Sequence, residues 1–263
     1  MINFFRKKRK TLANDHSYAK ASGGAKAFKY TRYAISEIVL VVIGIVIALQ
    51  INNWNEQRKN ANQELKLLQS FKIGLKEDLS DIDLNISIHT RGINSANMIL
   101  KLLESNQSYN NDTLAKHFNF VMPPSFFVNS TSAFETLKSK GIDLIKNETL
   151  RVELINVYDA QYTFFLKVES QFSEEQNIGL RNVFPSRFEE AYKFDLESSD
   201  YSGELAPLNF ESLKTDQEFL YYLKSIKNRT YIFVNYNYKR LRSQVVNLIT
   251  DIDKEINKIE NPQ

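Results

Sequence analysis

The chain has 263 residues, of which 43% are hydrophobic and 25% charged, so most of it has the composition of a protein that folds in water. Eight Gly and five Pro are few for this length, which disfavours sheet folds with many tight turns and favours long helices. The absence of cysteine excludes disulfides, thiolate metal sites and thiol catalysis.

The net charge of +3 is distributed unevenly along the chain. Residues 1–32 hold nine Lys or Arg against one acid, Asp15, whereas the remaining residues hold 25 basic and 30 acidic side chains. Because the basic excess belongs to the amino-terminal tail alone, we expect no nucleic-acid partner for the folded domain.

An apolar segment follows the basic tail. The twelve residues from Ile38 to Leu49 read IVLVVIGIVIAL and contain no polar side chain. Extending the segment to Tyr33 and Trp54 gives 22 residues, or about 33 Å of helix, which is enough to cross a bilayer. Tyr33 and Trp54 then stand where interfacial aromatic anchors are found. The sequence predicts a transmembrane helix over residues 33–54, with the lipid bilayer as its surroundings.

Two other interpretations of this segment explain less. A buried core helix would leave the one-sided charge unexplained. A cleaved signal peptide has an apolar core of this length, but the region before it exceeds thirty residues, and QINNWNE follows in place of a small-residue cleavage site. We therefore predict an uncleaved single-pass anchor in the inner membrane.

The basic tail orients the predicted anchor. By the positive-inside rule, residues 1–32 stay in the cytosol and residues 55–263 form a periplasmic helical domain. The topology charges stand near the amino terminus; they are Arg6, Lys7, Lys8, Arg9 and Lys10.

One face of the predicted span carries an acid and two small residues. Glu37, Gly44 and Ala48 follow one another at helical spacing. Small residues allow close approach of a second helix, and Glu37 has hydrogen-bonding capacity for it, so this face is a candidate for helix packing. In the alternative interpretation, Glu37 reaches back to the cytosolic interface and the small residues are incidental.

The region after the span predicts a bundle of three long helices. Apolar residues from Leu65 to Leu103 recur with coiled-coil spacing, interrupted by Lys72 and His89. A second block opens at Ser132, which forms a capping box with Glu135 in a short helix that stops at Gly141. Asn147 caps the next helix, which ends before Pro185. The second stripe consists of Leu150, Leu154, Val157, Phe164, Val168 and Phe172.

A third helix is predicted from the capping box of Thr215 and Glu218 to about Glu260. Its seam consists of Leu220, Tyr231, Val234, Tyr238, Leu241, Val245, Leu248, Ile252 and Ile259. Three such amphipathic helices can bury their apolar stripes from water only by packing against one another. The predicted fold is therefore all-α, with one amino-terminal transmembrane helix followed by an extracytoplasmic bundle of long antiparallel amphipathic helices.

No catalytic, cofactor or metal signature is evident. The three histidines are isolated, and His89 on an apolar seam is interpreted as a core residue. The acids Glu77, Asp78, Asp81 and Asp83 are typical of the wet side of a helix. Gly-rich phosphate loops and a G-x-S-x-G elbow are missing. We predict no catalytic, cofactor-binding or metal residues and no cofactor.

Tyrosine is abundant in the last helix, among Lys and Arg. An aromatic and basic surface of this kind binds polymers or peptides, but we expect core packing with the hydroxyl groups reaching solvent. The tyrosines in question are Tyr221, Tyr222, Tyr231, Tyr236 and Tyr238.

Two stretches resemble a known family. These are MINFFRKKR with AISEIVLVVIGIVIALQINNWNE (residues 34–56), and SAFETLKSKGIDLIKNETLR (residues 132–151). They resemble an uncharacterised family of single-pass membrane proteins from Gram-negative bacteria, a domain of unknown function. The resemblance implies a membrane-anchored helical domain and no known activity. The longer polar insert between Lys10 and Tyr33, which includes ASGGAK, departs from the family pattern and leaves the length of the cytosolic tail open.

The resulting hypothesis is a noncatalytic, membrane-anchored helical domain that binds a protein or cell-envelope component, with a sensory or scaffolding role. Its partner is then a second protein or a further copy of the chain. The alternative hypothesis is a membrane-bound enzyme whose site is assembled from distant helices. A deep polar pocket with convergent ionisable groups would favour the enzyme, and a solid core with an exposed apolar groove would favour the binding domain.

Overall fold

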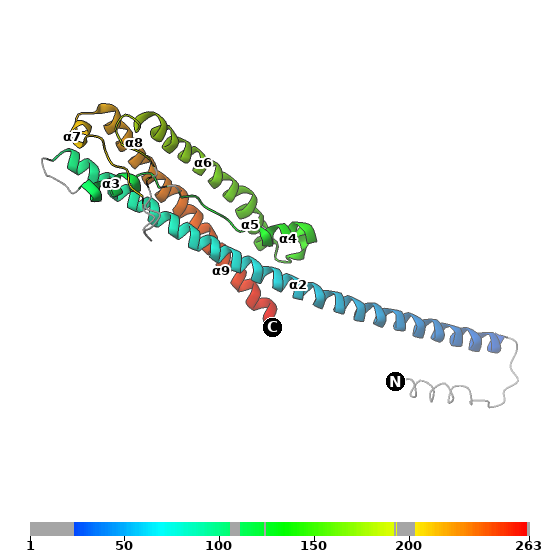
Figure 1. Cartoon of the computed structure of the whole chain (residues 1–263). Helices are drawn as coiled ribbons and strands as arrows, with labels where there is room; N and C mark the ends of the chain where they lie inside the picture. Colours follow the sequence, from blue (N-terminus) through cyan, green and yellow to red (C-terminus); the bar gives the residue numbers. More distant parts are fainter. Residues whose placement is uncertain (1–23, 106–110, 124, 192, 194–202, 262–263) are drawn as a thin grey trace. The chain divides into compact units, whose positions relative to one another are not determined.

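The computed structural model describes residues 24–105, 111–123, 125–191, 193 and 203–261, and the regular secondary structure of these residues is helical apart from two isolated β-bridges (Figure 1). The all-α class is therefore confirmed. The predicted topology charges, Arg6 to Lys10, lie outside the described residues. The chain divides into two compact units, Met1–Lys59 and Asn60–Gln263.

The first unit contains the amino-terminal part of α2, a helix that spans Gly24–Leu103. Among the described helices, α2 alone is long and apolar enough to cross a membrane, and none of its most apolar 18-residue window is buried. Every side chain from Tyr30 to Lys59 is exposed. A row of exposed Ile, Leu and Val is unfavourable in water because burial of apolar surface is the main stabilising term in folding. This segment is a candidate membrane anchor.

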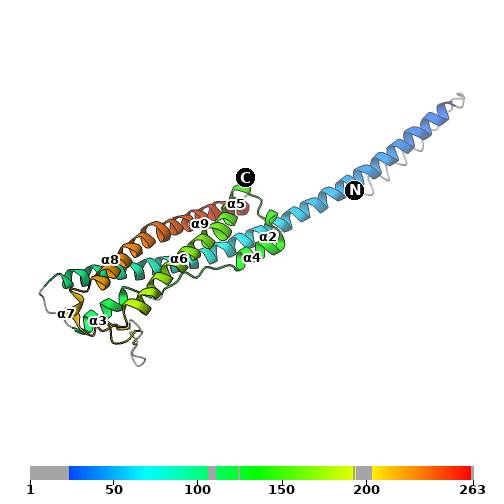
Figure 2. The ribbon, with the colours of Figure 1, turned by 90° about the horizontal axis from the view of Figure 1, so that it is seen from above.

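The second unit is built from three helical rods (Figures 1 and 2). The first is α2 from Asn60 onward. The second comprises α5 (Glu148–Ile155), η2 (Asn156–Gln161), α6 (Tyr162–Ile178) and η3 (Gly179–Val183). The third comprises α8 (Gln217–Ile232), η4 (Phe233–Tyr238) and α9 (Lys239–Glu260). Shorter helices join them: α3 (Asn111–Phe120), α4 (Ser132–Lys140), η1 (Ile142–Leu144) and α7 (Phe210–Leu213).

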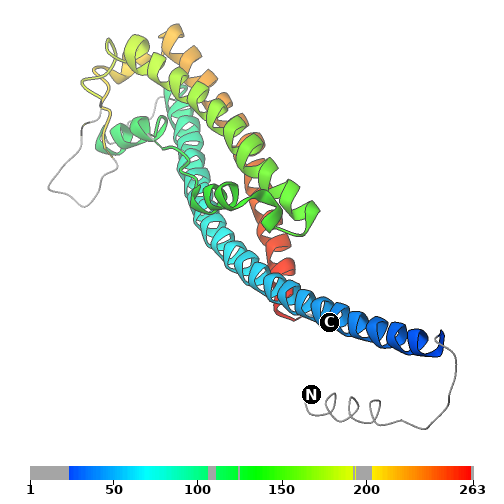
Figure 3. The ribbon, with the colours of Figure 1, turned by 90° about the vertical axis from the view of Figure 1, so that its right-hand side faces the viewer.

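The sequence predicted three antiparallel rods, but the rods do not alternate in direction. The third rod is antiparallel to α2, because the Tyr238 ring lies beside His89 and Asp253 pairs with Lys72. The second rod runs parallel to α2 (Figure 3), because Tyr162 contacts Asp78 and the Phe172 ring lies beside His89. The segment between α3 and α5 runs back along α2 before the second rod begins.

Two π-helical turns determine which aromatic side chains face the core. A π turn contains one extra residue and therefore rotates the following helix face by roughly 100° relative to an uninterrupted α-helix. The η2 turn precedes Phe164, which is 56% exposed, and the neighbouring Phe165 is buried in its place. The predicted stripe was wrong at this position. The η4 turn similarly brings Phe233 and Tyr238 inward together.

The capping predictions had mixed outcomes. Asn147 caps α5 as predicted, accepting a hydrogen bond from the Leu150 amide. The two capping boxes were wrong: α4 begins after Thr131 without a side-chain cap, and Asp216, not Thr215, caps α8. A carboxylate accepts the free amide hydrogens of a first turn and also interacts favourably with the helix dipole, which favours Asp216 over its neighbour.

The core follows the predicted seams and adds an aromatic layer between them. On the third rod, Tyr231 departs from its predicted seam and is 55% exposed. Of the residues predicted for the seam of α2, six are buried: Leu68, Leu75, Ile82, Ala96, Leu100 and Leu103. The layer between the rods stacks Phe165 and Phe172 on Phe233 at centroid distances of 5.7 and 4.5 Å. Such contacts add to the stability gained from apolar burial.

Candidate functional site

The interior of the second unit contains acids that the sequence did not reveal as buried. Asp78, predicted on the wet side of α2, is 1% exposed, and Glu64 on the same helix is 4% exposed. Glu169, on α6, is also 4% exposed. A buried carboxylate is costly unless hydrogen bonds satisfy it, so the partners of these groups determine what the site does.

The partners are backbone amides of an extended segment. We call residues 125–130 the strap; it lies against α2 and α6. Phe127 donates its amide to Glu169 Oε1 at 3.0 Å, and Ser130 donates its amide to Asp78 Oδ1 at 2.6 Å. Val128 donates to Asp81 Oδ2 at 3.1 Å. An extended segment without a neighbouring strand needs acceptors for its amides, and here carboxylates supply them.

The same pattern continues toward the carboxyl end of the chain. Lys146 donates its amide to Glu64 Oε1 at 2.7 Å, just before α5 begins. The Asn147 side chain, besides capping α5, donates to Glu255 Oε2 at 2.7 Å and so joins α5 to α9. At the other end of the strap, the Ser125 hydroxyl donates to Asn85 Oδ1. The acids therefore position the connection between the first two rods.

Two tyrosine hydroxyl groups donate further hydrogen bonds to Asp78 and Glu169. Tyr162 donates to Asp78 Oδ2 at 2.6 Å, and Tyr238 donates to Glu169 Oε1 at 2.8 Å. Burial raises the pKa of Asp78 to about 6, although the hydrogen bonds from Tyr162 and Ser130 oppose the shift. Burial also raises the pKa of Glu169 and of Glu64 above their usual range.

His89 is a core residue, as predicted. It is 1% exposed, and the rings of Phe172 and Phe233 meet it edge-on at centroid distances of 5.6 and 5.5 Å. Neither ring nitrogen has a hydrogen-bond partner among the described residues. Burial lowers the pKa of His89 to about 4, so the imidazole is neutral near pH 7.

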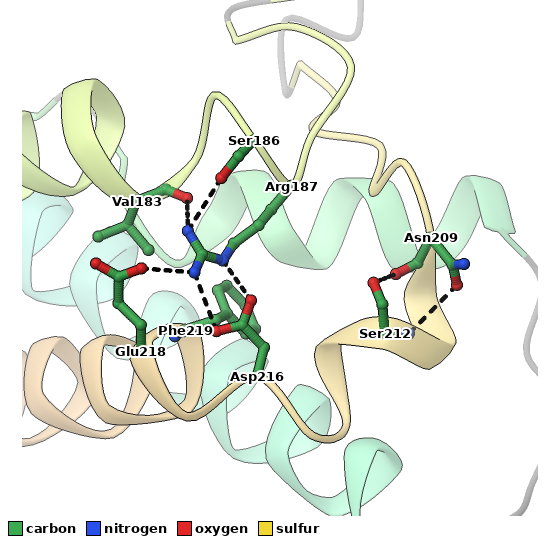
Figure 4. Close-up of polar contacts among 8 residues, drawn as sticks. All are labelled: Val183, Ser186, Arg187, Asn209, Ser212, Asp216, Glu218 and Phe219. Atoms are coloured by element: carbon green, nitrogen blue, oxygen red, sulfur yellow. Dashed lines mark hydrogen bonds and ion pairs between the residues drawn. The ribbon is translucent and has the colours of Figure 1, made fainter.

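A salt-bridge cluster holds the start of α8 (Figure 4). Arg187 donates to both carboxylate oxygens of Asp216, at 2.6 and 3.0 Å, and to Glu218 at 2.7 Å. Its remaining nitrogen donates to the Val183 carbonyl oxygen and to Ser186 Oγ. Asp216 caps α8 by accepting the Phe219 amide at 3.0 Å. Because the planar guanidinium uses all its nitrogens, the cluster is a structural clamp that fixes where the third rod begins.

The tyrosines of the third rod divide into two groups, which corrects the prediction that all pack in the core with hydroxyl groups reaching solvent. The hydroxyl of Tyr238 is buried against Glu169, and that of Tyr222 donates to the Glu175 carbonyl oxygen. Tyr221, Tyr231 and Tyr236 are 77%, 55% and 68% exposed.

The exposed tyrosines lie on one outer face of the third rod. We call this face the tyrosine–cation stripe; its members are Tyr221, Lys224, Asn228, Tyr231, Ile232, Tyr236 and Arg240. Apart from the adjacent pair Tyr231 and Ile232, successive members are three or four residues apart, the spacing of neighbours along one side of a helix. The stripe is about 28 Å long at ~1.5 Å per residue. Tyrosine and arginine are enriched in protein interfaces, so the stripe is the candidate interaction surface.

Other features expected of a catalytic site are weak in the part of the chain that the structure describes. A small cavity beside α3 is lined by Phe118, Asn119, Met122, Leu180, Ala191 and Leu205, and offers no group of ionisable side chains. Within the described ranges, no cluster of three or more His, Asp or Glu is arranged to hold a metal ion.

The residues predicted for the membrane span belong to the first unit. Glu37, Gly44 and Ala48 are exposed on α2, and a β-carbon added at Gly44 would meet no atom within 4 Å. Tyr33 and Trp54, the predicted interfacial anchors, are 54% and 63% exposed. Their roles stay predictions.

Comparison with known proteins identifies a family but no characterised relative. A family model described as "Family of unknown function (DUF6090)" matches residues 37–203, which is more than half of the chain. No curated protein and no solved structure matches the sequence. The matched range includes the apolar segment, the strap and the second rod, and ends before the tyrosine–cation stripe. The chain therefore belongs to the DUF6090 family of unknown function.

Proposed function

We propose that this protein is a noncatalytic, membrane-anchored helical domain that binds a protein or cell-envelope component. Its amino-terminal tail is cytosolic, residues 33–54 span the inner membrane, and residues 55–263 form the periplasmic domain. The observation that carries the proposal is the role of the buried acids. Asp78, Glu169 and Glu64 each accept a hydrogen bond from a backbone amide, so these carboxylates hold the fold together and do not face a ligand.

The surface provides the complementary argument. The buried carboxylates of Asp78 and Glu169 are hydrogen-bonded to the strap, whereas large aromatic side chains are exposed to solvent on the third rod. The rings of Tyr221 and Tyr236 remain in solvent, so the fold does not gain the free energy of burying their apolar surface. Binding a partner on this face would bury that surface.

Composition and exposure together support the proposed membrane span. The apolar segment has no protein cover in the first unit, and nine cationic residues precede Tyr33. Hydrocarbon satisfies such a helix, and the cationic tail favours retention in the cytosol.

The orientation is tested with alkaline phosphatase fused to the carboxyl terminus of the full-length chain, because this enzyme is active only after export. We expect an active fusion and recovery of the protein in the membrane fraction. Reversing the tail charges, Arg6 to Lys10, to Glu is expected to reduce fusion activity several-fold. An inactive fusion of the unmodified chain, or a full-length product in the soluble fraction, would contradict the proposed topology.

The binding role is tested by affinity purification of the full chain from detergent-solubilised membranes across several growth conditions. The matched control is a chain with the charge reversals Lys224→Glu and Arg240→Glu. A component recovered with the unmodified protein and absent from the control supports the proposal. Failure to recover any specific component under all conditions contradicts it.

A further inference from the structure

We infer that the tyrosine–cation stripe binds an acidic amphipathic segment of another protein. The inference rests on the proposed function, because it assigns the surface and the partner chemistry of the same binding domain. It is carried by the charge, composition and exposure of the third rod.

The middle of this rod differs sharply in charge from the rest of the second unit. Between Phe219 and Thr250 the chain contains six Lys or Arg and no Asp or Glu. The remainder of the sequence after the basic tail is net acidic. A helical surface of one sign repels cations and attracts a negatively charged partner.

Some of these cations are already engaged within the fold. Arg229 pairs with Glu175 at 2.9 Å, and Arg242 pairs with Asp83 at 2.6 Å. Lys224 and Arg240, both on the stripe and both exposed, form no ion pair in the described parts of the chain. These two cations, about 24 Å apart along the helix at ~1.5 Å per residue, are therefore available to carboxylates of a partner.

The apolar members of the stripe indicate what else the partner must present. Ile232, 51% exposed, lies between the two cations with Tyr231 and Tyr236 beside it. A uniformly anionic polymer offers no apolar group to an isoleucine, whereas a protein segment that alternates carboxylates with apolar side chains matches both kinds of contact. Tyrosine also loses little conformational entropy on binding, which suits an anchor residue.

The stripe is also mechanically supported. The first turn of α8, just before Tyr221, is held by the Arg187 and Asp216 clamp. The stripe also crosses the η4 turn, whose inward side chain Tyr238 donates a hydrogen bond to Glu169. Tyr236 and Tyr238 belong to the same π turn and face opposite ways, since the first is 68% exposed and the second is buried. A rigid surface binds with a smaller entropic cost than a mobile one.

The test uses photo-crosslinking in the full-length, membrane-embedded protein. A photoreactive amino acid replaces Tyr221 or Tyr236 on the stripe, and, as the matched control, Gln171 on the outer side of α6. Adducts are identified by mass spectrometry. We expect adducts from the two stripe positions to a net-negative segment of another protein, and at least fivefold fewer from Gln171.

Charge reversal supplies the second measurement. The double substitution Lys224→Glu and Arg240→Glu is expected to lower adduct yield from Tyr236 about tenfold, in keeping with the loss and reversal of two ion pairs. The control Lys167→Glu, an exposed position on α6, is expected to leave the yield unchanged. Raising the salt concentration should lower the yield in the unmodified protein.

The remaining outcomes separate this inference from the proposed function. Adducts to a neutral or basic protein segment, to a second copy of the chain, to lipid or to polysaccharide overturn the inference. Adducts from Gln171 but not from the stripe overturn the surface assignment and leave the binding function standing. No adduct at any position under any growth condition overturns both.

Discussion

The Tyr162 hydroxyl donates a hydrogen bond to Asp78 across 2.6 Å, although the two residues are 84 positions apart in the sequence. Asp78 at the same time accepts the Ser130 amide, so one carboxylate links α2, the strap and α6. The price of this arrangement is a buried acid whose pKa is about 6 instead of 3.8. That cost makes the stability of the second unit depend on pH.

The substitution Asp78→Asn is expected to remove the contribution of Asp78 to this pH dependence. The folded-state pKa is raised, so the folded state binds the proton more tightly than the unfolded state, and the stability contributed by the protonated acid is lost as pH rises from about 4 through about 6. Between pH 4 and pH 7.5, the unfolding free energy of the Asp78→Asn variant should therefore improve by about 1–3 kcal/mol relative to the unmodified chain.

Urea denaturation of the full-length protein in detergent, followed by circular dichroism at both pH values, measures this difference. The comparison cancels the opposite contribution of His89, whose lowered pKa removes stability as pH falls from about 6.5 through about 4 and which is present in both proteins. A relative stability that does not change with pH would refute the assigned role of Asp78.

The substitution Tyr162→Phe should destabilise the second unit by about 1–3 kcal/mol, because it leaves the buried carboxylate of Asp78 one hydrogen bond short. The control Tyr221→Phe removes a hydroxyl from a side chain that is 77% exposed and should change stability by less than about 0.5 kcal/mol. Denaturation midpoints under matched conditions provide the measurement. Equal effects of the two substitutions would mean that the buried hydrogen bond contributes nothing.

The substitution Arg187→Lys should destabilise the fold by roughly 1–3 kcal/mol, because lysine cannot form the two-pronged contact with Asp216 and also reach Glu218. The matched control is Arg181→Lys, since the Arg181 pair with Glu174 is largely exposed and should contribute less than about 1 kcal/mol. Hydrogen exchange at the first turn of α8 reports the local effect. Unchanged protection there in the Arg187 variant would count against the clamp.

The substitution Gly44→Ile tests the predicted packing face of the membrane span. If Gly44 and Ala48 allow close approach of a second helix, a reporter of membrane-helix association should lose several-fold of its signal on substitution. The control Val42→Ile changes a bulky apolar side chain elsewhere on the helix and should have little effect. Association that is the same in both variants would favour the interpretation in which the small residues are incidental.

Local sequence patterns were enough to predict the helical class, the apolar segment and the number of long rods. Each of these depends on local patterns: twelve consecutive apolar residues from Ile38 to Leu49, and apolar side chains at helical spacing elsewhere. The cap at Asn147 was equally local, because its acceptor atom and the Leu150 amide lie three residues apart. His89 was recognised as a core residue from its place on an apolar seam.

The direction of the second rod, the burial of the acids and the exposure of three tyrosines depend on contacts between segments that are far apart in the sequence. The strap runs back along α2 because Asp78 and Glu169 accept its amides, and no spacing in the sequence reveals a partner 42 or 52 residues away. A π turn changes which side chains face outward without changing the composition. The sequence pattern therefore did not indicate that Phe165 is buried and Phe164 exposed. Helical periodicity records which residues share a face, but which face meets a neighbour depends on contacts between distant segments.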